Sequence, residues 1–248
     1  MKVVILCGGR GLRLHEETEF RPKPMVMVGN RPILWHIMKI YAHYGFKDFI
    51  LCLGYKGEMI KDYFINYRWR SSDLTVEIGK ERLTFHTPNS EHDWKVTLAE
   101  TGLNAMTGAR VKRVEKYIRG DTFMLTYGDG LANIDIRALL KFHRSHGKIA
   151  TVTGVHPPSR FGELYMEGKQ ATVFTEKPQV GQGFINGGFF VLNRKIFDYV
   201  EDDDSCIFER EAMEGLARDG QLMVYRHTGY WQCMDTIRDL QNLNEAWS

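Results

Sequence analysis

Cysteine is scarce in this sequence, and the cysteines are scattered. Four of them are spread over 248 residues, at Cys7, Cys52, Cys206 and Cys233. No two have the close spacing of paired metal ligands. Cys7 and Cys52 fall inside apolar segments, where cysteine usually packs as a small hydrophobe. We therefore expect no cysteine-based metal site and no disulfide framework, and a reducing, cytoplasmic location.

Charge of one sign and long apolar runs are also missing. The 33 Lys and Arg residues nearly balance 31 Asp and Glu residues, for a net charge of +2. Such a balance gives no strong electrostatic preference for nucleic acid or membranes. No apolar stretch approaches the roughly 20 residues that span a bilayer, and the run from Val3 to Cys7 is too short for a signal-peptide core. We expect no nucleic-acid partner and no membrane partner.

Apolar strand-like runs alternate with helical patterns along most of the chain. The patterns predict buried strands at residues 2–7, 48–53, 122–126 and 149–155, and helices at 32–44, 55–67, 107–118, 136–146, 208–218 and 235–247. Segments with period-two alternation lie at 74–78, 82–86 and 94–98, with further short strands at 164–166, 171–174, 189–192, 222–225 and 229–233. The sequence therefore predicts the α/β class, with a Rossmann-like, mixed but mainly parallel sheet, flanking helices and β-rich insertions. No repeat or linker divides residues 1–248, so we expect a single domain.

The first strand runs into a glycine-rich loop, Gly8-Gly9-Arg10-Gly11. Glycines allow close backbone approach to a ligand, and successive free N–H groups form a concavity that binds anions. Arg13 and Lys23 add positive charge nearby. The pattern predicts a phosphate site at the carboxyl end of the first strand, with a plain tight turn as the alternative. It is neither a Walker loop nor a dinucleotide fingerprint, because it lacks the residues that define them.

Two aspartates are candidate metal ligands. Asp129 follows a predicted strand between two glycines, and one or two carboxylates with phosphate oxygens are a typical Mg²⁺ environment. The alternative for Asp129 is ordinary turn chemistry. Asp235 precedes the last predicted helix, so it is either a second metal ligand or the N-cap of that helix.

Three further segments allow both a functional and a structural interpretation. Lys177, next to Glu176, is either a contact to a substrate phosphate or part of a solvated strand edge. Asn186 and Gly187 precede an apolar strand and either contact sugar hydroxyls or form a turn. Arg110, near the start of the helix predicted at 107–118, either faces a triphosphate or lies on a surface helix.

In this order, the motifs resemble the sugar-phosphate nucleotidyltransferase family almost from end to end. The matching blocks are Gly8-Gly9-Arg10-Gly11, Arg13-Leu14, Pro22-Lys23-Pro24-Met25, Thr126-Tyr127-Gly128-Asp129-Gly130, Glu176-Lys177-Pro178, Asn186-Gly187-Gly188-Phe189-Phe190, and Trp231-Gln232 with Met234-Asp235-Thr236. Within the family they are most similar to the cytidylyltransferases, which use CTP and glucose 1-phosphate.

The resemblance implies a reaction in which a sugar 1-phosphate attacks the α-phosphorus of CTP and releases pyrophosphate, with Mg²⁺ as cofactor. It implies a nucleotide-binding front at about 1–130, a sugar-phosphate-binding back at about 131–248, and a homo-oligomer. The implied catalytic residues are Arg13, Lys23 and Asp129, and the implied metal ligands are Asp129 and Asp235. The implied nucleotide contacts are Leu6, Cys7, Gly8, Gly9, Arg10, Gly11, Leu12, Arg13, Lys23, Ala105, Arg110 and Gly128, and the implied sugar-phosphate contacts are Glu176, Lys177, Asn186 and Gly187.

Three residues depart from the family pattern. Leu12 and Ala105 stand where the family usually has a hydroxyl residue, and Met27 stands where it often has glutamate. These departures keep two alternatives open: a transferase for another phosphorylated acceptor, and a non-catalytic nucleotide or sugar sensor. Retention of all four charged residues, Arg13, Lys23, Asp129 and Asp235, argues against the sensor.

Overall fold

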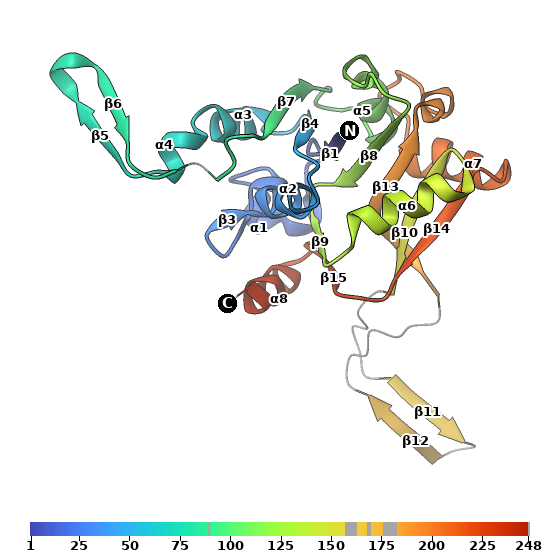
Figure 1. Ribbon diagram of the computed structural model, residues 1–248. Helices are drawn as coiled ribbons and strands as arrows, with labels where there is room; N and C mark the ends of the chain where they lie inside the picture. The colour runs from blue at the N-terminus through green and yellow to red at the C-terminus, as the bar shows by residue number, and fades with distance from the viewer. Residues whose placement is uncertain (89, 157–162, 168–169, 176–182, 248) are drawn as a thin grey trace.

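A seven-stranded sheet forms the centre of the computed structural model, which describes residues 1–88, 90–156, 163–167, 170–175 and 183–247 (Figure 1). Its strands are β1 (Lys2–Leu6), β4 (Asp48–Leu53), β7 (Lys95–Glu100), β8 (Thr122–Tyr127), β10 (Ala150–Val155), β13 (Ile185–Asn193) and β14 (Leu222–His227). Their spatial order is β14-β10-β13-β8-β1-β4-β7. Only β13 runs against its neighbours, since β8, β1, β4 and β7 pair in parallel, as do β10 and β14. The mixed, mainly parallel sheet that the sequence predicts is confirmed.

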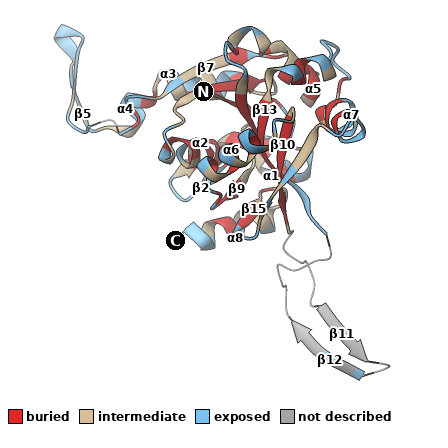
Figure 2. Ribbon diagram, turned by 45° about the vertical axis from the view of Figure 1, so that its right-hand side comes forward, coloured by how far each residue is buried: buried red, intermediate tan, exposed pale blue. Residues whose placement is uncertain are grey.

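Helices cover both faces of this sheet. One face carries α2 (Ile33–His43), α3 (Gly57–Ile65) and α6 (Ile136–His146), and the other carries α5 (Thr107–Arg113), the π-helical turn η6 (Phe208–Glu214) and α7 (Gly215–Arg218). Alternate residues of β1 serve the two layers: Val3 and Ile5 pack with α2, and Val4 packs with α5. All three are fully buried, as the buried core strands of Figure 2 illustrate. Such two-sided burial explains why this strand reads as a continuous apolar run.

Of the antiparallel strand pairs outside the central sheet, two have the longest strands. β5 (Leu74–Glu77) and β6 (Arg82–Phe85) form a hairpin that extends away from the body (Figure 1), and β11 (Glu163–Glu167) pairs with β12 (Gln170–Thr175). These are the β-rich insertions that the sequence predicts. The third period-two segment is different, because β7 is the edge strand of the main sheet and pairs in parallel with β4. Its prediction as part of the excursion is wrong, because Val96 and Leu98 pack against one layer of the core and Ala99 against the other, while the strand ends are exposed.

Several predicted helices are shorter or divided. The helix predicted at 107–118 ends at Arg113, and a 3₁₀ turn, η4 (Glu115–Tyr117), follows. The helix predicted at 55–67 is shorter, as α3, and a separate helix, α4 (Tyr67–Ser71), begins where that prediction ended. The helix predicted at 208–218 is divided into η6 and α7. The last helix, α8, spans Ile237–Trp247. Within the described residues, no helix is both long and apolar enough to cross a membrane.

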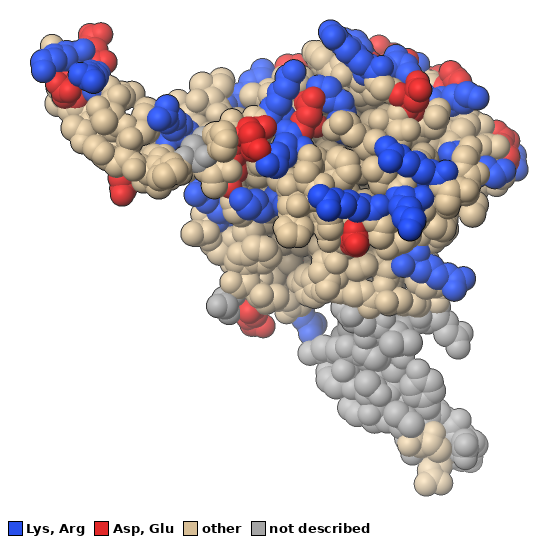
Figure 3. Space-filling model, viewed as in Figure 1, with Lys and Arg blue, Asp and Glu red and all other residues tan. Residues whose placement is uncertain are grey.

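The remaining elements are short and lie mainly between β1 and α2 or near α8. They are η1 (Leu12–Leu14), α1 (His15–Thr18), η2 (Lys23–Met25), β2 (Met27–Val28), β3 (Arg31–Pro32), η3 (Ile78–Lys80), β9 (Gly130–Ala132), η5 (Arg194–Tyr199) and β15 (Trp231–Cys233). β9 and β15 pair antiparallel, which joins the segment after β8 to the segment before α8. In Figure 3, positive and negative side chains are interspersed over the visible face, in keeping with the near-zero net charge.

Candidate active site

The glycine loop after β1 is held in place by Arg110, a buried residue of α5. Its guanidinium donates from Nη2 to the Gly8 carbonyl oxygen (3.0 Å), and from Nη1 to the carbonyl oxygens of Leu53 (3.0 Å) and Gly102 (2.8 Å). A Cβ atom on Gly8 would lie only 2.1 Å from Arg110 Nη1, so this packing requires glycine. The surface-helix interpretation of Arg110 is therefore wrong. The guanidinium organises the loop through the backbone.

Thr18 fixes the other end of the loop. Its hydroxyl shares its proton between the carbonyl oxygens of Gly11 (3.1 Å) and Leu14 (3.0 Å). Gly11 has a φ of 66°, in the left-handed region that glycine adopts most readily. Both ends of the loop are thus tied to a buried side chain, which preorganises its backbone.

A cavity of about 840 Å³ opens over this loop and is here called the nucleotide cavity. All twelve residues predicted to contact the nucleotide line it: Leu6, Cys7, Gly8, Gly9, Arg10, Gly11, Leu12, Arg13, Lys23, Ala105, Arg110 and Gly128. Asp129, Asn104, Thr107 and Tyr127 line it as well. These residues come from four separate segments and form one continuous surface; that this surface binds a nucleotide stays a prediction.

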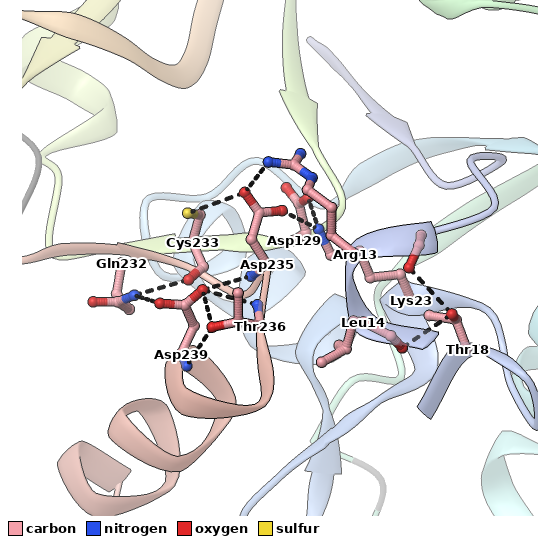
Figure 4. Close-up of polar contacts among 11 residues, drawn as sticks. Arg13, Leu14, Thr18, Lys23, Asp129, Gln232, Cys233, Asp235, Thr236 and Asp239 are labelled. Carbon is pink, nitrogen blue, oxygen red and sulfur yellow. Dashed lines mark hydrogen bonds and ion pairs between the residues drawn. The ribbon is translucent and has the colours of Figure 1, made fainter. Parts of the chain in front are cut away.

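Four charged side chains meet beside this cavity, and three of them, Arg13, Lys23 and Asp129, line it (Figure 4). Lys23 Nζ lies 2.6 Å from Asp129 Oδ2 and 2.6 Å from Asp235 Oδ1, and Arg13 Nη1 lies 2.7 Å from Asp235 Oδ2. Lys23 is buried, with 8% of its surface exposed, whereas Arg13 is exposed. Prolines 22 and 24 flank Lys23 at the short turn η2, and Pro fixes φ, so the backbone that carries the ammonium is rigid.

The cluster keeps Lys23 and Asp235 charged. Burial alone would lower the pKa of the Lys23 ammonium, but the carboxylates of Asp129 and Asp235 outweigh burial and raise that pKa. Burial alone would raise the pKa of Asp235, but Lys23 and then Arg13 hold it below its ordinary value. An ammonium and a carboxylate with these shifts are both ionised around neutral pH.

The pairing of β9 with β15 brings the two aspartates together. Met234 N donates to the Asp129 carbonyl oxygen (2.8 Å), across chain segments more than a hundred residues apart. Asp235 is not the N-cap of α8, so that interpretation is wrong. The carboxylate of Asp239 instead accepts from the N–H groups of Asp235 (3.1 Å) and Thr236 (2.9 Å), and Asp239 N donates to Thr236 Oγ1 (3.2 Å), as in a capping box. The Asp235 carboxylate is left to face Lys23.

The aspartate pair fits a magnesium ion that substrate phosphates would complete. Asp129 and Asp235 both face the same ammonium group at hydrogen-bond distance. Two carboxylates, with phosphate oxygens and water as further ligands, match the usual Mg²⁺ environment. The described part of the chain holds no cluster of three or more His, Cys, Asp or Glu residues suited to a metal. An all-protein metal cage is therefore not the kind of site seen here.

A second cavity of about 350 Å³ adjoins the first and is here called the acceptor cavity. The two share Arg13, Tyr127 and Asp129 in their linings. Asn186 and Gly187, two of the four residues predicted to bind the sugar phosphate, line the acceptor cavity. The other two, Glu176 and Lys177, lie outside the described residues.

Comparison with known proteins decides the family. Residues 2–247 match the family model described as "Nucleotidyl transferase". The chain belongs to this nucleotidyltransferase family. It is 50% identical to the glucose-1-phosphate cytidylyltransferase of Salmonella typhi, over 100% of this chain and 96% of that protein. It is 48% identical to the probable glucose-1-phosphate cytidylyltransferase of Bacillus subtilis, with the same coverage. The family resemblance predicted from the motifs is confirmed.

Solved structures agree with the fold of this nucleotidyltransferase. The crystal structure of HddC from Yersinia pseudotuberculosis superposes with a TM-score of 0.70 at 25% identity, over 100% of this chain and 99% of that one. A putative glucose-1-phosphate thymidylyltransferase from Bacillus anthracis shares the fold, with a TM-score of 0.65 at 19% identity, over 99% of this chain and 94% of that one.

The three residues that depart from the family pattern occupy different places. Leu12 is 73% exposed at the edge of the nucleotide cavity, and Ala105 is a buried part of its wall. Met27 lies on β2 and lines neither cavity. Two of the departures therefore concern the surface toward the nucleotide, and none concerns the described wall of the acceptor cavity.

Sequence reasoning assigned no role to two acceptor-cavity side chains of this nucleotidyltransferase. Glu209, on η6, accepts from Tyr127 Oη (2.5 Å) and lines the acceptor cavity. Trp231, on β15, donates from Nε1 to the Gly187 carbonyl oxygen (2.8 Å). Trp231 lies in a block that carries the family resemblance, which was a usable signal. Glu209 lies in no motif, and only the folded chain brings it to the site.

Proposed function

We propose that this nucleotidyltransferase transfers the cytidylyl group of CTP to α-D-glucose 1-phosphate, giving CDP-glucose and pyrophosphate. The observation that carries the proposal is the pair of adjoining cavities, with the Lys23, Asp129 and Asp235 cluster at their junction. A two-substrate transfer needs such a junction, because both reactants must meet at one set of charges. The choice of CTP and glucose 1-phosphate rests on the printed names of relatives that are 48% and 50% identical over the full chain.

In the proposed reaction, a phosphate oxygen of the sugar phosphate attacks the α-phosphorus of CTP. The bond from that phosphorus to the bridging oxygen of pyrophosphate breaks, and pyrophosphate leaves with the electron pair. Catalysis of such a transfer is mainly positioning and charge stabilisation. Lys23 is the fixed cation at the junction, so we assign it to the charge that develops on the α-phosphate. Arg13 is exposed on the wall shared by the cavities and would hold the departing pyrophosphate.

Asp129 and Asp235 would hold Mg²⁺, which when bound supplies charge neutralisation to the nucleophile and the nucleotide phosphates. The residues of the chain provide the remaining chemistry. Gly8 to Gly11 present backbone N–H groups along the nucleotide cavity, an arrangement suited to phosphate oxygens. The preorganised loop needs little rearrangement when the triphosphate binds, which reduces the entropic cost of binding.

The second half of the chain supplies the acceptor side. Asn186 and Gly187 line the acceptor cavity, and we assign Glu176 and Lys177 to the sugar phosphate from the family resemblance alone. In this proposal residues 1–248 act as one nucleotidyltransferase domain, since the central sheet contains strands from both halves. We further propose a homo-oligomer, on the same resemblance.

The test is pyrophosphate release with Mg²⁺, across CTP, dTTP, UTP, ATP and GTP against a panel of sugar 1-phosphates. A dominant signal for CTP with glucose 1-phosphate supports the proposal. Strong CTP dependence with a different sugar phosphate would keep the cytidylyl transfer and replace the acceptor. Binding of CTP without turnover on any acceptor would favour the sensor alternative over the enzyme.

A further inference from the structure

A chain of hydrogen bonds runs from the nucleotide cavity to the acceptor cavity through Glu209. On one side, Thr107 Oγ1, at the start of α5, donates to Glu209 Oε2 (2.7 Å). On the other, Tyr127 Oη, at the end of β8, donates to Glu209 Oε1 (2.5 Å). Asn186 Nδ2, on β13, then donates to Tyr127 Oη (3.0 Å). Four elements that are distant in sequence are joined in one network.

Glu209 dictates the direction of the hydrogen bonds that Tyr127 makes. A carboxylate can only accept hydrogen bonds, so the Tyr127 hydroxyl must donate its single proton to Glu209. The Tyr127 oxygen is then an acceptor toward Asn186, which must present its NH₂ group. Burial, and then the charge of Glu209, raise the pKa of Tyr127, which keeps its hydroxyl protonated. The Asn186 carbonyl, on the opposite side of the amide, accepts from Gly188 N (2.9 Å).

The surrounding packing fixes the positions of the side chains in this network. Gly188 has a φ of 80°, and a Cβ there would lie 2.6 Å from Tyr127 Cδ2. The Tyr127 ring also packs edge-on against Phe190, with ring centroids 5.8 Å apart. On the other side of Glu209, Phe208 N donates to Thr107 Oγ1 (2.9 Å), which orients that hydroxyl toward the carboxylate.

We propose that Glu209 is a positioning residue for the acceptor substrate. Gly188 N holds the carbonyl side of the Asn186 amide, and Glu209, through Tyr127, holds its NH₂ side, so that one N–H is used on Tyr127 and the other is available to a ligand in the acceptor cavity. A sugar phosphate offers hydroxyl and phosphoryl oxygens as acceptors for that N–H. This inference rests on the proposed function, because it concerns the acceptor side of the same reaction.

The central experiment replaces Glu209 by glutamine, which has the same shape but can either donate or accept. The Tyr127 hydroxyl is then no longer forced to donate to residue 209, and the Asn186 amide keeps only its anchor at Gly188 N. We expect KM for the sugar phosphate to rise about tenfold, the loss of roughly one oriented hydrogen bond. We expect KM for CTP and the thermal midpoint to stay close to wild type. Glu214→Gln, on the same turn but exposed and outside both cavities, is the control and leaves both KM values unchanged.

A double-mutant cycle with Tyr127→Phe tests whether Glu209 acts through Tyr127. Tyr127→Phe removes the relay hydroxyl and so should raise the acceptor KM to the same extent. Adding Glu209→Gln to it should then have no further effect, because coupled residues are not additive. Independent, multiplicative effects would mean that Glu209 contacts the acceptor directly, and would overturn the proposal.

Two outcomes separate this inference from the proposed function. A wild-type protein with no turnover on any nucleotide and acceptor pair refutes the proposed function itself. An active wild type whose acceptor KM is unchanged by Glu209→Gln refutes only the positioning role. If Glu209→Gln does not fold, Tyr127→Phe decides alone, and an unchanged acceptor KM in that variant overturns the proposal.

Discussion

The nucleotide cavity and the acceptor cavity differ in the kinds of groups that form them. The first is built around the backbone of the glycine loop that follows β1, which Arg110 holds through the Gly8 carbonyl oxygen. The second is formed by side chains from β8, β13, η6 and β15 that hydrogen-bond to one another. A backbone site suits triphosphate, the group that all nucleotide donors share. A side-chain site suits a sugar, whose identity lies in the direction of its hydroxyl groups.

The charge cluster belongs to both cavities, so damage to it should have the largest effect. Lys23→Met preserves length but leaves two carboxylates without their shared cation. We expect kcat to fall by about 10²–10³-fold, the usual cost of removing one stabilising group from a transition state. Pyrophosphate release at saturating substrates measures it, with Lys195→Met as the control, since Lys195 is exposed and lines neither cavity. A loss of less than tenfold would remove Lys23 from the chemistry.

A substitution in the glycine loop should raise the KM for the nucleotide alone. The Cβ of Gly8→Ala would collide with the Arg110 guanidinium. Displacement of the guanidinium would break its hydrogen bonds to the carbonyl oxygens of Leu53 and Gly102, so the loop would lose its anchor. We expect KM for CTP to rise by at least about tenfold, the cost of one or two lost hydrogen bonds, while the acceptor KM changes little. Gly79→Ala, in the β5–β6 hairpin with nothing within 4 Å of its Cβ, is the control. Equal increases in both KM values would show that the cavities are not independent.

The contrast between the cavities also explains what the sequence could reveal. The glycine loop and Lys23 lie within 23 residues, so their pattern is visible in a single motif and predicted the cavity wall. The partners of Glu209 lie 82 and 102 residues away, and no local pattern connects them. Asp235 was a plausible N-cap of α8 by its position, and only the hydrogen bonds show that Thr236 and Asp239 form the capping box instead. The sheet was predictable from its buried strands. The exception is β7, an edge strand whose alternating pattern we had interpreted as part of the insertion outside the sheet.

A glycine substitution on the acceptor side should give the opposite pattern. Gly188→Ala places a Cβ against the Tyr127 ring and imposes a left-handed φ on a non-glycine residue. We expect the acceptor KM to rise severalfold with KM for CTP unchanged, and a stability loss of about 1–2 kcal/mol from the backbone conformation. Gly45→Ala carries a similar φ of 90° with nothing within 4 Å, so it should show the stability loss alone. If Gly45→Ala raised the acceptor KM as much, the effect would be one of general destabilisation.

The smallest expected effect is on stability in acid, and it concerns the half of the sheet that carries Asn186. His143, on α6 beneath β10, hydrogen-bonds Thr151 Oγ1 through Nδ1 (3.0 Å). Burial, with the charges of His146 and Arg144, lowers the pKa of His143 from 6.5 to about 4. Because the unfolded chain binds this proton more readily, the contribution of neutral His143 to the free energy of unfolding is fully present above about pH 6.5 and is lost as the pH decreases toward 4. From pH 7 to pH 5 the loss from this group is about 2 kcal/mol, at 1.36 kcal/mol for each pKa unit.

His143→Asn should remove most of that loss, since asparagine does not titrate in this range. Urea unfolding at pH 7 and pH 5 measures the difference for the wild type, the variant and His43→Asn, an exposed control on α2. The wild type and His43→Asn should lose stability equally, and His143→Asn should lose about 2 kcal/mol less. An identical pH dependence in all three proteins would mean that protonation of His143 does not contribute to acid sensitivity. The loss of stability would then have to come from other groups, such as His36 on α2, whose pKa is also lowered by burial.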